Sequence, residues 1–193
     1  MANGLRKYVN GLTGDDGNSG DLGSPYLTLN AAALAAQTAG KDNWIYFQNL
    51  THTTALTLGG TGTTALLLNK LIQQDAGSVI TVPAGTGITF TGDPFYHVYA
   101  RSCNNGANGA YVPASTYGRI KFFSGTYLGN VSAGIAGATG RVCDLDANVA
   151  NSNGTSGFDI YAARSVPDVT NCTANFNTVS GFTGGDCQGA RSP

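Results

Sequence analysis

The chain has 193 residues, enough for one domain with a hydrophobic core, and 11% of them are charged, with a formal net charge of −1. This composition excludes a basic stripe for nucleic acid and an acidic field for a cationic partner, and no apolar run reaches the roughly 20 residues of a membrane span. All eleven acidic residues are Asp and 28 residues are Gly, which predicts short strands joined by tight turns.

The first seven residues, Met-Ala-Asn-Gly-Leu-Arg-Lys, contain no apolar stretch long enough for a secretory signal. We therefore expect a protein that is made and used without signal-directed export, unless a leader preceded this sequence. A short strand is predicted at Tyr8-Val9. The segment 14–25 that follows is rich in Gly, Asp and Asn and is predicted to be a succession of turns.

One helix is predicted, over residues 29–38. Thr28 is placed to cap its N-terminus and Gly40 to end it, and seven of the ten residues between them are Leu or Ala. Leu29, Ala32, Ala33 and Ala36 share one face at helical spacing. Because that face is apolar and made of small residues, we expect it to cover the open end of a β-structure, where unpaired strand edges need protection.

From residue 44 onward the pattern changes to short strands bounded by turn residues. The predicted strands are 44–47, 54–58, 79–82, 87–91, 96–99, 119–123, 157–161 and 179–182. Residues 65–72 are compatible with a second short helix, but a buried strand is favoured. Residues 101–118 show no pattern and are predicted to be an inserted loop, either a solvated excursion or a loop that contacts a partner.

Two stretches near the C-terminus, 150–158 and 174–182, repeat at an offset of 24 residues. A fixed period of this length predicts units that stack on their neighbours, here the coils of a β-solenoid. Stacked coils bring equivalent residues about 4.8 Å apart. Phe158 would then pack on Phe182, and an amide ladder would join Asn153 to Asn177 or Asn151 to Asn175. Residues 44–193 have room for about six such coils.

The opening of the chain resembles that of the pectate-lyase-like, right-handed parallel β-helix superfamily. The residues that carry the resemblance are Tyr8-Val9, the loop 15–20, Ser24-Pro25-Tyr26-Leu27-Thr28-Leu29 and the strand 42–47. The coil 171–177 with Gly181-Phe182 is similar to coils of bacteriophage tailspike-like helices.

The resemblance covers roughly residues 7–60 and 142–187. It implies an all-β fold, a right-handed parallel β-helix of about six coils with an N-terminal capping helix. Residues 1–43 would form the strand, turn loop and capping helix. Residues 44–193 would form the β-helix body, with the inserted loop near 101–118.

Enzymes of this fold need acidic residues, often with Lys or Arg, that converge on one outward face. The best candidates are Asp144 and Asp146, two residues apart on a predicted strand, with Arg141 before them. Arg164 and Asp168 follow about one coil later. Such a group could bind calcium or a uronate, but a pair of exposed turn carboxylates beside a surface ion pair is the favoured interpretation.

Three other sets of residues have the composition of a site. The segment Asp15 to Asp21 lacks the spacing of a calcium loop and is predicted to be a capped turn. His52 and His97 are predicted to be solvated or hydrogen-bonded. No two of the four cysteines form a CxxC pair, which argues against a zinc or redox site. Buried thiols are favoured, and a disulfide between residues 143 and 172 is the alternative. The cysteines are Cys103, Cys143, Cys172 and Cys187.

From the resemblance, the short chain and the lack of a clear catalytic cluster, we expect a non-enzymatic virion structural protein of a tailed bacteriophage. It would be a trimeric capsid-decoration (knob or cement) or spike protein on the virion surface, made in the host cytoplasm. Its partners would be further copies of the chain, other virion proteins such as the major capsid protein, and host surface glycans as an open alternative. We expect no nucleic acid, membrane or cofactor, and assign no catalytic, cofactor-binding or metal-binding residue.

The alternative is a polysaccharide-cleaving or glycan-binding tailspike-like module. It predicts a groove lined by Tyr, Trp and Asp, with Asp144, Asp146 and Arg164 at its floor.

Overall fold

The computed structural model describes residues 5–38, 43–60, 68–92, 95–113, 119–137, 142–160 and 169–183. These residues form one helix, α1 (Leu29–Thr38), and fifteen short strands. The strands are β1 (Leu5–Asn10), β2 (Asn43–Gln48), β3 (Thr51–His52), β4 (Leu56–Gly60), β5 (Leu68–Gln73), β6 (Val79–Ile80), β7 (Ile88–Gly92), β8 (Phe95–Tyr99), β9 (Ala110–Val112), β10 (Arg119–Phe123), β11 (Ile135–Gly137), β12 (Val142–Asp146), β13 (Ser156–Ile160), β14 (Val169–Thr170) and β15 (Ser180–Thr183).

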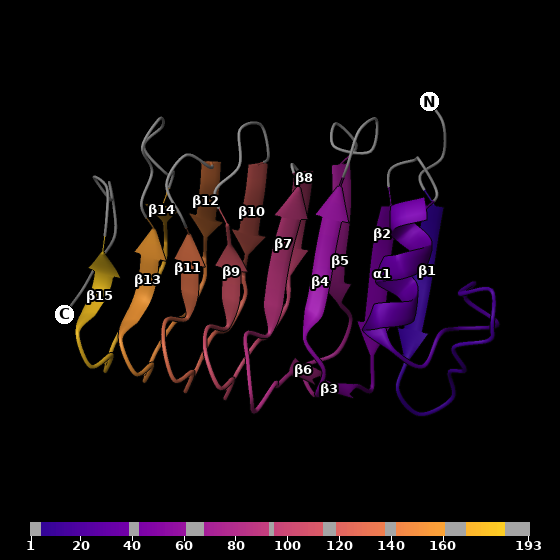
Figure 1. Cartoon of the computed structure of the whole chain (residues 1–193), viewed down its shortest axis with the longest axis horizontal. Helices are drawn as coiled ribbons and strands as arrows, with labels where there is room; N and C mark the ends of the chain where they lie inside the picture. Colours follow the sequence, from indigo (N-terminus) through magenta and orange to yellow (C-terminus); the bar gives the residue numbers. More distant parts are fainter. Residues whose placement is uncertain are drawn as a thin grey trace.

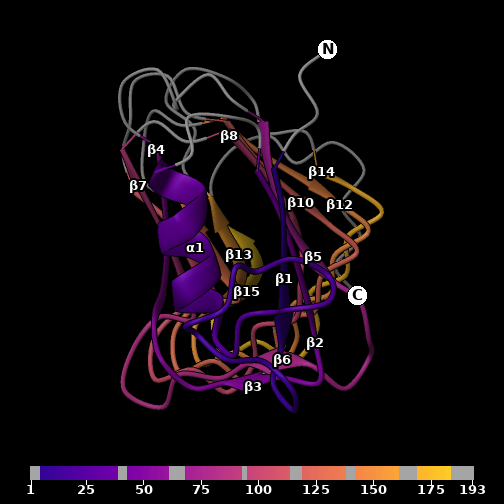
Figure 2. The ribbon, with the colours of Figure 1, turned by 90° about the vertical axis from the view of Figure 1, so that its right-hand side faces the viewer.

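The strands stack in parallel into two long sheets and one short sheet (Figure 1). The seven-stranded sheet has the order β1-β2-β5-β8-β10-β12-β14, and the six-stranded sheet has the order β4-β7-β9-β11-β13-β15. The short sheet pairs β3 with β6. Seen end-on, the chain winds repeatedly from one sheet to the next around a common core (Figure 2). The predicted all-β parallel solenoid with one N-terminal helix is therefore confirmed.

The core is built by inward side chains that alternate with outward ones along each strand. In β2, Ile45 and Phe47 are fully buried, whereas Trp44 and Tyr46 point outward and are half-buried. Parallel pairing in register places Ile45 beside Leu71 of the next coil, so apolar residues form continuous stacks along the solenoid. Such stacks exclude water from the interior, which is the main source of stability for short strands of this kind.

The helix α1 covers the N-terminal end of the solenoid, as the sequence predicts. It begins after Thr28, whose Oγ1 accepts a hydrogen bond from the Ala31 backbone N–H at 3.3 Å. Its buried face consists of Leu29, Ala32, Ala33 and Ala36, and the helix packs beside β4 at the edge of the six-stranded sheet (Figure 2). No helix among the described residues is long and apolar enough to cross a membrane.

A buried ladder of asparagine side chains joins four successive coils. Asn105 donates from its side-chain nitrogen to Asn130 at 2.7 Å, Asn130 donates in the same way to Asn153 at 2.9 Å, and Asn153 donates to Asn177 at 2.9 Å. Each acceptor oxygen also receives a backbone N–H from the preceding coil. The ladder predicted from Asn153 and Asn177 is confirmed and extends two coils further towards the N-terminus.

The predicted aromatic stack is also present. The rings of Phe158 and Phe182 lie 5.1 Å apart with an angle of 29° between their planes, and the two residues are paired in register between β13 and β15. The 24-residue offset seen in the sequence is thus the length of one coil at this position. The alternative ladder, between the side chains of Asn151 and Asn175, is not formed. The two residues are joined by one hydrogen bond, from the Asn175 backbone N–H to Asn151 Oδ1 at 2.7 Å.

The structure differs from the sequence prediction at residues 101–113. These residues do not leave the solenoid: Ser102 and Asn104 donate backbone hydrogen bonds to the next coil, and β9 lies within the six-stranded sheet. The segment was predicted as a loop because its inward residues are small, among them Ser102, Asn105 and Ala110, so apolar alternation is weak. Residues 114–118 lie outside the described part. Residues 68–72 form the favoured strand, within β5.

Candidate functional site

The outer face of the seven-stranded sheet carries two rows of side chains that run across the coils. Because the strands pair in register, outward residues of equal position line up along the solenoid. The aromatic row consists of Tyr8, Tyr46, Ile72, Tyr99 and Phe123. The charged row consists of Arg6, Trp44, Lys70, His97, Lys121 and Asp144.

The aromatic row contains two stacked pairs. The rings of Tyr8 and Tyr46 lie 5.3 Å apart at 16° between planes, and those of Tyr99 and Phe123 lie 5.0 Å apart at 14°. The four rings are half-buried, so each exposes part of its surface to solvent. Rings held in this way offer flat apolar surface together with phenolic hydroxyl groups, at little cost in side-chain entropy.

The charged row places cations against an aromatic ring. The Lys70 Nζ lies 4.3 Å from the centre of the Trp44 ring, and the Arg6 guanidinium lies 5.5 Å from it. His97 follows in the row, and its pKa is lowered by burial and then by the neighbouring Lys70 and Lys121 charges. His97 therefore adds no positive charge near neutral pH.

Asp144, the first candidate catalytic residue, is held in a cluster with two cations. Its Oδ2 lies 2.6 Å from a terminal nitrogen of Arg119 and 2.9 Å from Lys121 Nζ. Burial acts to raise the pKa of Asp144, but the hydrogen bonds from Lys121 and Arg119 outweigh it and hold the pKa below its ordinary value. The carboxylate is thus ionised and bound to two side chains of the preceding strand, which suits a cross-strand ion pair rather than a general acid.

Asp146 lies beside Asp144 but has different partners. Its Oδ1 accepts a hydrogen bond from Thr170 Oγ1 at 2.9 Å and one from the Asn171 side chain at 3.4 Å. Both Asp residues line a small hollow of about 130 Å³ together with Lys121, Phe123, Leu145 and Thr170. The structure therefore brings the two acids together, while Arg141, Arg164 and Asp168 lie outside the described residues.

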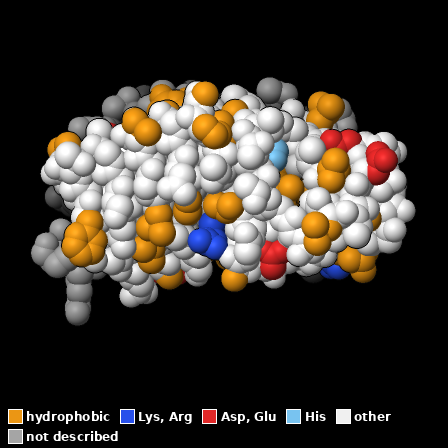
Figure 3. All heavy atoms as spheres, turned by 90° about the horizontal axis from the view of Figure 1, so that it is seen from below, with side chains coloured by type: hydrophobic (Ala, Val, Ile, Leu, Met, Phe, Trp, Pro, Cys, Tyr) orange, Lys and Arg blue, Asp and Glu red, His pale blue; other side chains and the backbone are white. Residues whose placement is uncertain are grey.

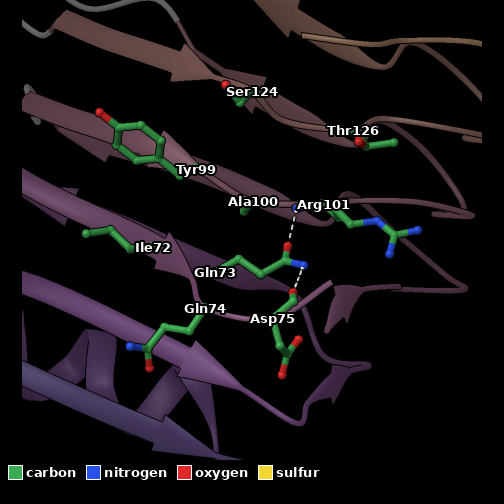
Figure 4. A pocket seen from close by; sticks show the side chains of 9 residues that line it. All are labelled: Ile72, Gln73, Gln74, Asp75, Tyr99, Ala100, Arg101, Ser124 and Thr126. Carbon is green, nitrogen blue, oxygen red and sulfur yellow. Dashed lines mark hydrogen bonds between the residues drawn. The ribbon is translucent and has the colours of Figure 1, made fainter. Parts of the chain in front are cut away.

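A larger hollow lies beside Ile72 and Tyr99 of the aromatic row (Figure 4). It has a volume of about 390 Å³, and Ala100 is among its lining residues. The Gln73 side chain accepts a hydrogen bond from the Arg101 backbone N–H at 2.9 Å and donates one to the Asp75 backbone carbonyl. The remaining lining residues are Ile72, Gln74, Ser124 and Thr126. The hollow thus presents one ring, two amides, two hydroxyls and a guanidinium.

The Asp75 carboxylate at this hollow is hydrogen-bonded to backbone N–H groups. It accepts hydrogen bonds from the backbone N–H groups of Asn49 and Ser78, the second at 2.6 Å. Burial acts to raise its pKa, but these bonds and that of the Ser78 hydroxyl bring the pKa below its ordinary value. Asp75 is therefore an ionised turn cap and not a proton donor.

The turn segment 14–25 has the capped-turn structure predicted for it. Asp16 accepts bonds from the backbone N–H groups of Leu27 and Thr28 at 2.9 and 2.8 Å and from the Thr28 hydroxyl at 2.8 Å. Asp15 accepts from the Gly17 N–H at 2.8 Å. Within the described residues, no three His, Cys or acidic side chains gather closely enough to hold a metal ion.

Two of the four cysteines, Cys103 and Cys172, have described side chains, and both are buried. Cys103 is a free thiol and is buried, and burial raises its pKa, so it is an unreactive core residue. Cys172 is also buried and its sulfur accepts a hydrogen bond from the Asn148 backbone N–H at 3.4 Å. Cys187 and the side chain of Cys143 lie outside the described part of the chain.

His52 is a buried core residue and not a site residue. It points inward from β3, and its Nε2 lies 3.3 Å from Thr54 Oγ1. Burial lowers its pKa from 6.5 to about 4. At neutral pH the ring is therefore uncharged inside the solenoid.

Stability is expected to fall as the pH drops from about 6.5 towards 4. The unfolded chain binds a proton at His52 below pH 6.5, whereas the folded chain resists protonation until about pH 4. The free energy of unfolding should decrease by about 2 kcal/mol between pH 7 and pH 5. Urea unfolding at several pH values measures this, with His52→Gln as the variant that should lose the dependence and His97→Gln as the control that should keep most of it. An unchanged slope in His52→Gln would contradict the assignment.

Comparisons with known proteins assign no family to the chain. No family model matches the sequence, and no curated protein matches it. Among solved structures, the chain is similar to one described as "Rhamnogalacturonan lyase", with 12% sequence identity and a TM-score of 0.39. The match covers 96% of this chain and 60% of that one, so the chain spans about three fifths of that protein's length. At this identity neither activity nor substrate is carried over to the chain.

The glycan-binding alternative expects Tyr, Trp and Asp along one face, but the sequence did not identify the residues that form the aromatic and charged rows. A signal exists in two strands, where Trp44 and Tyr46 alternate with Ile45 and Phe47, and Tyr99 follows Val98. The alternation marks these rings as outward, but the register that aligns them across five coils comes from strand pairing, which is not visible in one strand.

Proposed function

We propose that the chain is a non-enzymatic virion structural protein of a tailed bacteriophage, a trimeric capsid-decoration (knob or cement) or spike protein at the virion surface. The observation that supports a non-enzymatic role is the ion pairing of Asp144. This carboxylate is the best candidate for a catalytic acid, but it is bound by Arg119 and Lys121. Its partner Asp146 is bound by Thr170. Both acids stabilise contacts between coils.

The phage assignment rests on the tailspike-like coil in residues 171–182 and on the physical character of the body. A solenoid whose coils are joined by a buried amide ladder and ring stacks is stiff and presents a repetitive outer surface. Those properties suit a protein that projects from or reinforces a shell by contact with other virion proteins, such as the major capsid protein.

The test is the presence of the chain in purified particles. Mass spectrometry of virions from the phage that encodes it should find the chain, at a copy number that is a multiple of three if the trimer is correct. The purified chain should leave a broad panel of polysaccharides uncleaved. Absence from the particle, or turnover of a polysaccharide that is lost in an Asp144→Ala, Asp146→Ala variant, would overturn the proposal.

A glycan-binding module is the second candidate, favoured by the aromatic row and the hollow beside Tyr99. Sugar rings are bound by flat apolar surface with amide, hydroxyl and guanidinium groups around it, and the hollow presents each of these (Figure 4). If this candidate is correct, a glycan array should give a hit, and Tyr99→Ala should weaken that binding at least about tenfold. Tyr26→Ala is unsuitable as a control because Tyr26 is buried, whereas Tyr111→Ala, on a different sheet, should leave binding unchanged.

A further inference from the structure

We infer that residues 169–183, the last described coil, form the surface through which copies of this chain contact one another, with Phe176 at its centre. The inference deepens the proposed function, on which it rests for the expectation of a homo-oligomer. Three observations carry it: a strained and exposed Phe, a buried acceptor without a partner, and an edge without charge.

Phe176 combines two unfavourable features. Its side chain is 86% exposed, and its backbone has a φ of 57°. The equivalent positions of earlier coils adopt the same left-handed conformation but hold Asn104, Gly129 and Ser152, which are small or polar. A bulky side chain in this region is disfavoured, and strain of this kind is found where a functional contact requires it. No contact within the described residues offsets the cost, so we assign the offsetting contact to another chain.

Asn175, the residue before Phe176, has a side-chain oxygen that lacks a donor. Its own backbone N–H donates to Asn151 Oδ1 of the preceding coil at 2.7 Å. The same bond repeated once more would place an N–H on Asn175 Oδ1, but this oxygen is buried and no hydrogen bond to it is found among the described residues. An unpaired buried acceptor is destabilising, because it has lost its hydrogen bonds to water and gained none in return. A donor group from a neighbouring copy, packed against the last described coil, would remove that cost.

The last described coil also lacks charged residues and prolines. Residues 169–183 contain no Lys, Arg, Asp or Pro, whereas exposed strand edges normally carry charges or prolines against pairing. Val179, three residues after Phe176, is 70% exposed and adds apolar surface to this coil. Seen from below, the C-terminal end of the described surface shows hydrophobic side chains and neither red nor blue atoms, while the acidic side chains lie towards the other end (Figure 3).

A second copy of this chain is the occupant that fits these features. Two uncharged coils can approach without desolvating a charge, and each supplies N–H groups, carbonyls and an exposed Phe to the other. Stacking onto the N-terminal end of a neighbour is blocked, because α1 covers the edge of the six-stranded sheet there and Tyr26 pairs with the outer side of β1 (Figure 1). Contact between copies therefore brings their last described coils together, around the three-fold axis of the proposed trimer.

The experiment is light scattering after gel filtration of the full chain over a range of concentrations, for the wild type and for Phe176→Gly. Gly adopts a positive φ without strain, so the variant should fold with unchanged or higher thermal stability. The wild type should assemble, and Phe176→Gly should raise the dissociation constant at least about tenfold, as expected for an aromatic residue at the centre of an interface. Val179→Asn should also weaken assembly, while Leu22→Asn, a 74% exposed residue at the opposite end, should not.

Two results would overturn the inference. If the wild-type chain is monomeric at all concentrations, the last described coil is covered by residues 184–193 of the same chain and not by another copy. An oligomer that is equally stable in Phe176→Gly and Val179→Asn would place the contact elsewhere. Neither result depends on whether the chain is found in virions, so failure of this inference is distinguishable from failure of the proposed function.

Discussion

Replacing Asn130 by Ala is expected to lower the free energy of unfolding by about 4 kcal/mol. The reason is that each buried polar group left without a partner costs about 1–3 kcal/mol. Asn130 Oδ1 accepts both the backbone N–H and the side-chain amide of Asn105, at 3.1 and 2.7 Å. Its own side-chain nitrogen donates to Asn153 at 2.9 Å. Ala would leave the backbone N–H of Asn105 and one of its two side-chain N–H groups without an acceptor, since the other donates to Ser102 Oγ at 3.2 Å. Asn105 and Asn130 are each 1% exposed, so water cannot reach these donors without opening the coil.

Urea unfolding followed by circular dichroism measures this change, with Asn151→Ala as the matched control. Asn151 lies one coil further on, is half-buried, and accepts a single bond, from the Asn175 N–H. The control should lose about 1 kcal/mol. Equal losses in the two variants would mean that the ladder contributes no more than an ordinary surface hydrogen bond.

The ladder also shows how far the sequence specifies this fold. The motif Asn-x-x-x-Gly followed by an apolar or small residue occurs at Asn105, Asn130, Asn153 and Asn177, with Gly109, Gly134, Gly157 and Gly181 as the matching glycines. The last two copies are similar enough to be found as a repeat. The first two escaped because Ala110 and Ile135 replace the Phe, and because coil lengths vary between copies.

The motif has a physical explanation in the structure. A Cβ at Gly109 would lie 3.0 Å from the Asn130 side-chain nitrogen, and one at Gly157 would lie 2.8 Å from that of Asn177. The glycines therefore make space for the ladder amides of the next coil. Sequence alone predicts the repeated coils near the C-terminus, the Thr28 helix cap and the ring stack because each depends on local spacing or a close repeat.

The candidate site was less predictable. Asp144 and Asp146 were identified as neighbours on one strand face, which the structure confirms, but their role depends on residues of other coils. Arg119 lies 25 positions before Asp144 in the sequence and reaches it through strand pairing between β10 and β12. Phe176 likewise gives no local signal, since its left-handed backbone is inherited from the geometry of the coils beneath it.

Replacing Gly134 by Ala is expected to destabilise the fold by about 3 kcal/mol, the range in which overpacking of a closely packed interior falls. A Cβ at this position would lie 2.6 Å from the Gly157 carbonyl oxygen and 2.9 Å from the Ala150 Cβ. Both atoms belong to the next coil, whose distance is fixed by strand pairing and by the ladder beside it, so neither can move without disturbing several hydrogen bonds. The expected result is a decrease in melting temperature with an unchanged circular dichroism spectrum at low temperature.

Gly77→Ala is the matched control, because a Cβ at Gly77 would meet no atom within 4 Å. That substitution should change the free energy of unfolding by less than about 0.5 kcal/mol, or raise it slightly by restricting the unfolded chain. If Gly134→Ala were as well tolerated as Gly77→Ala, the coils could separate locally at little cost. The stiffness that supports a structural role would then be absent, and the ladder would hold the coils less tightly than its geometry indicates.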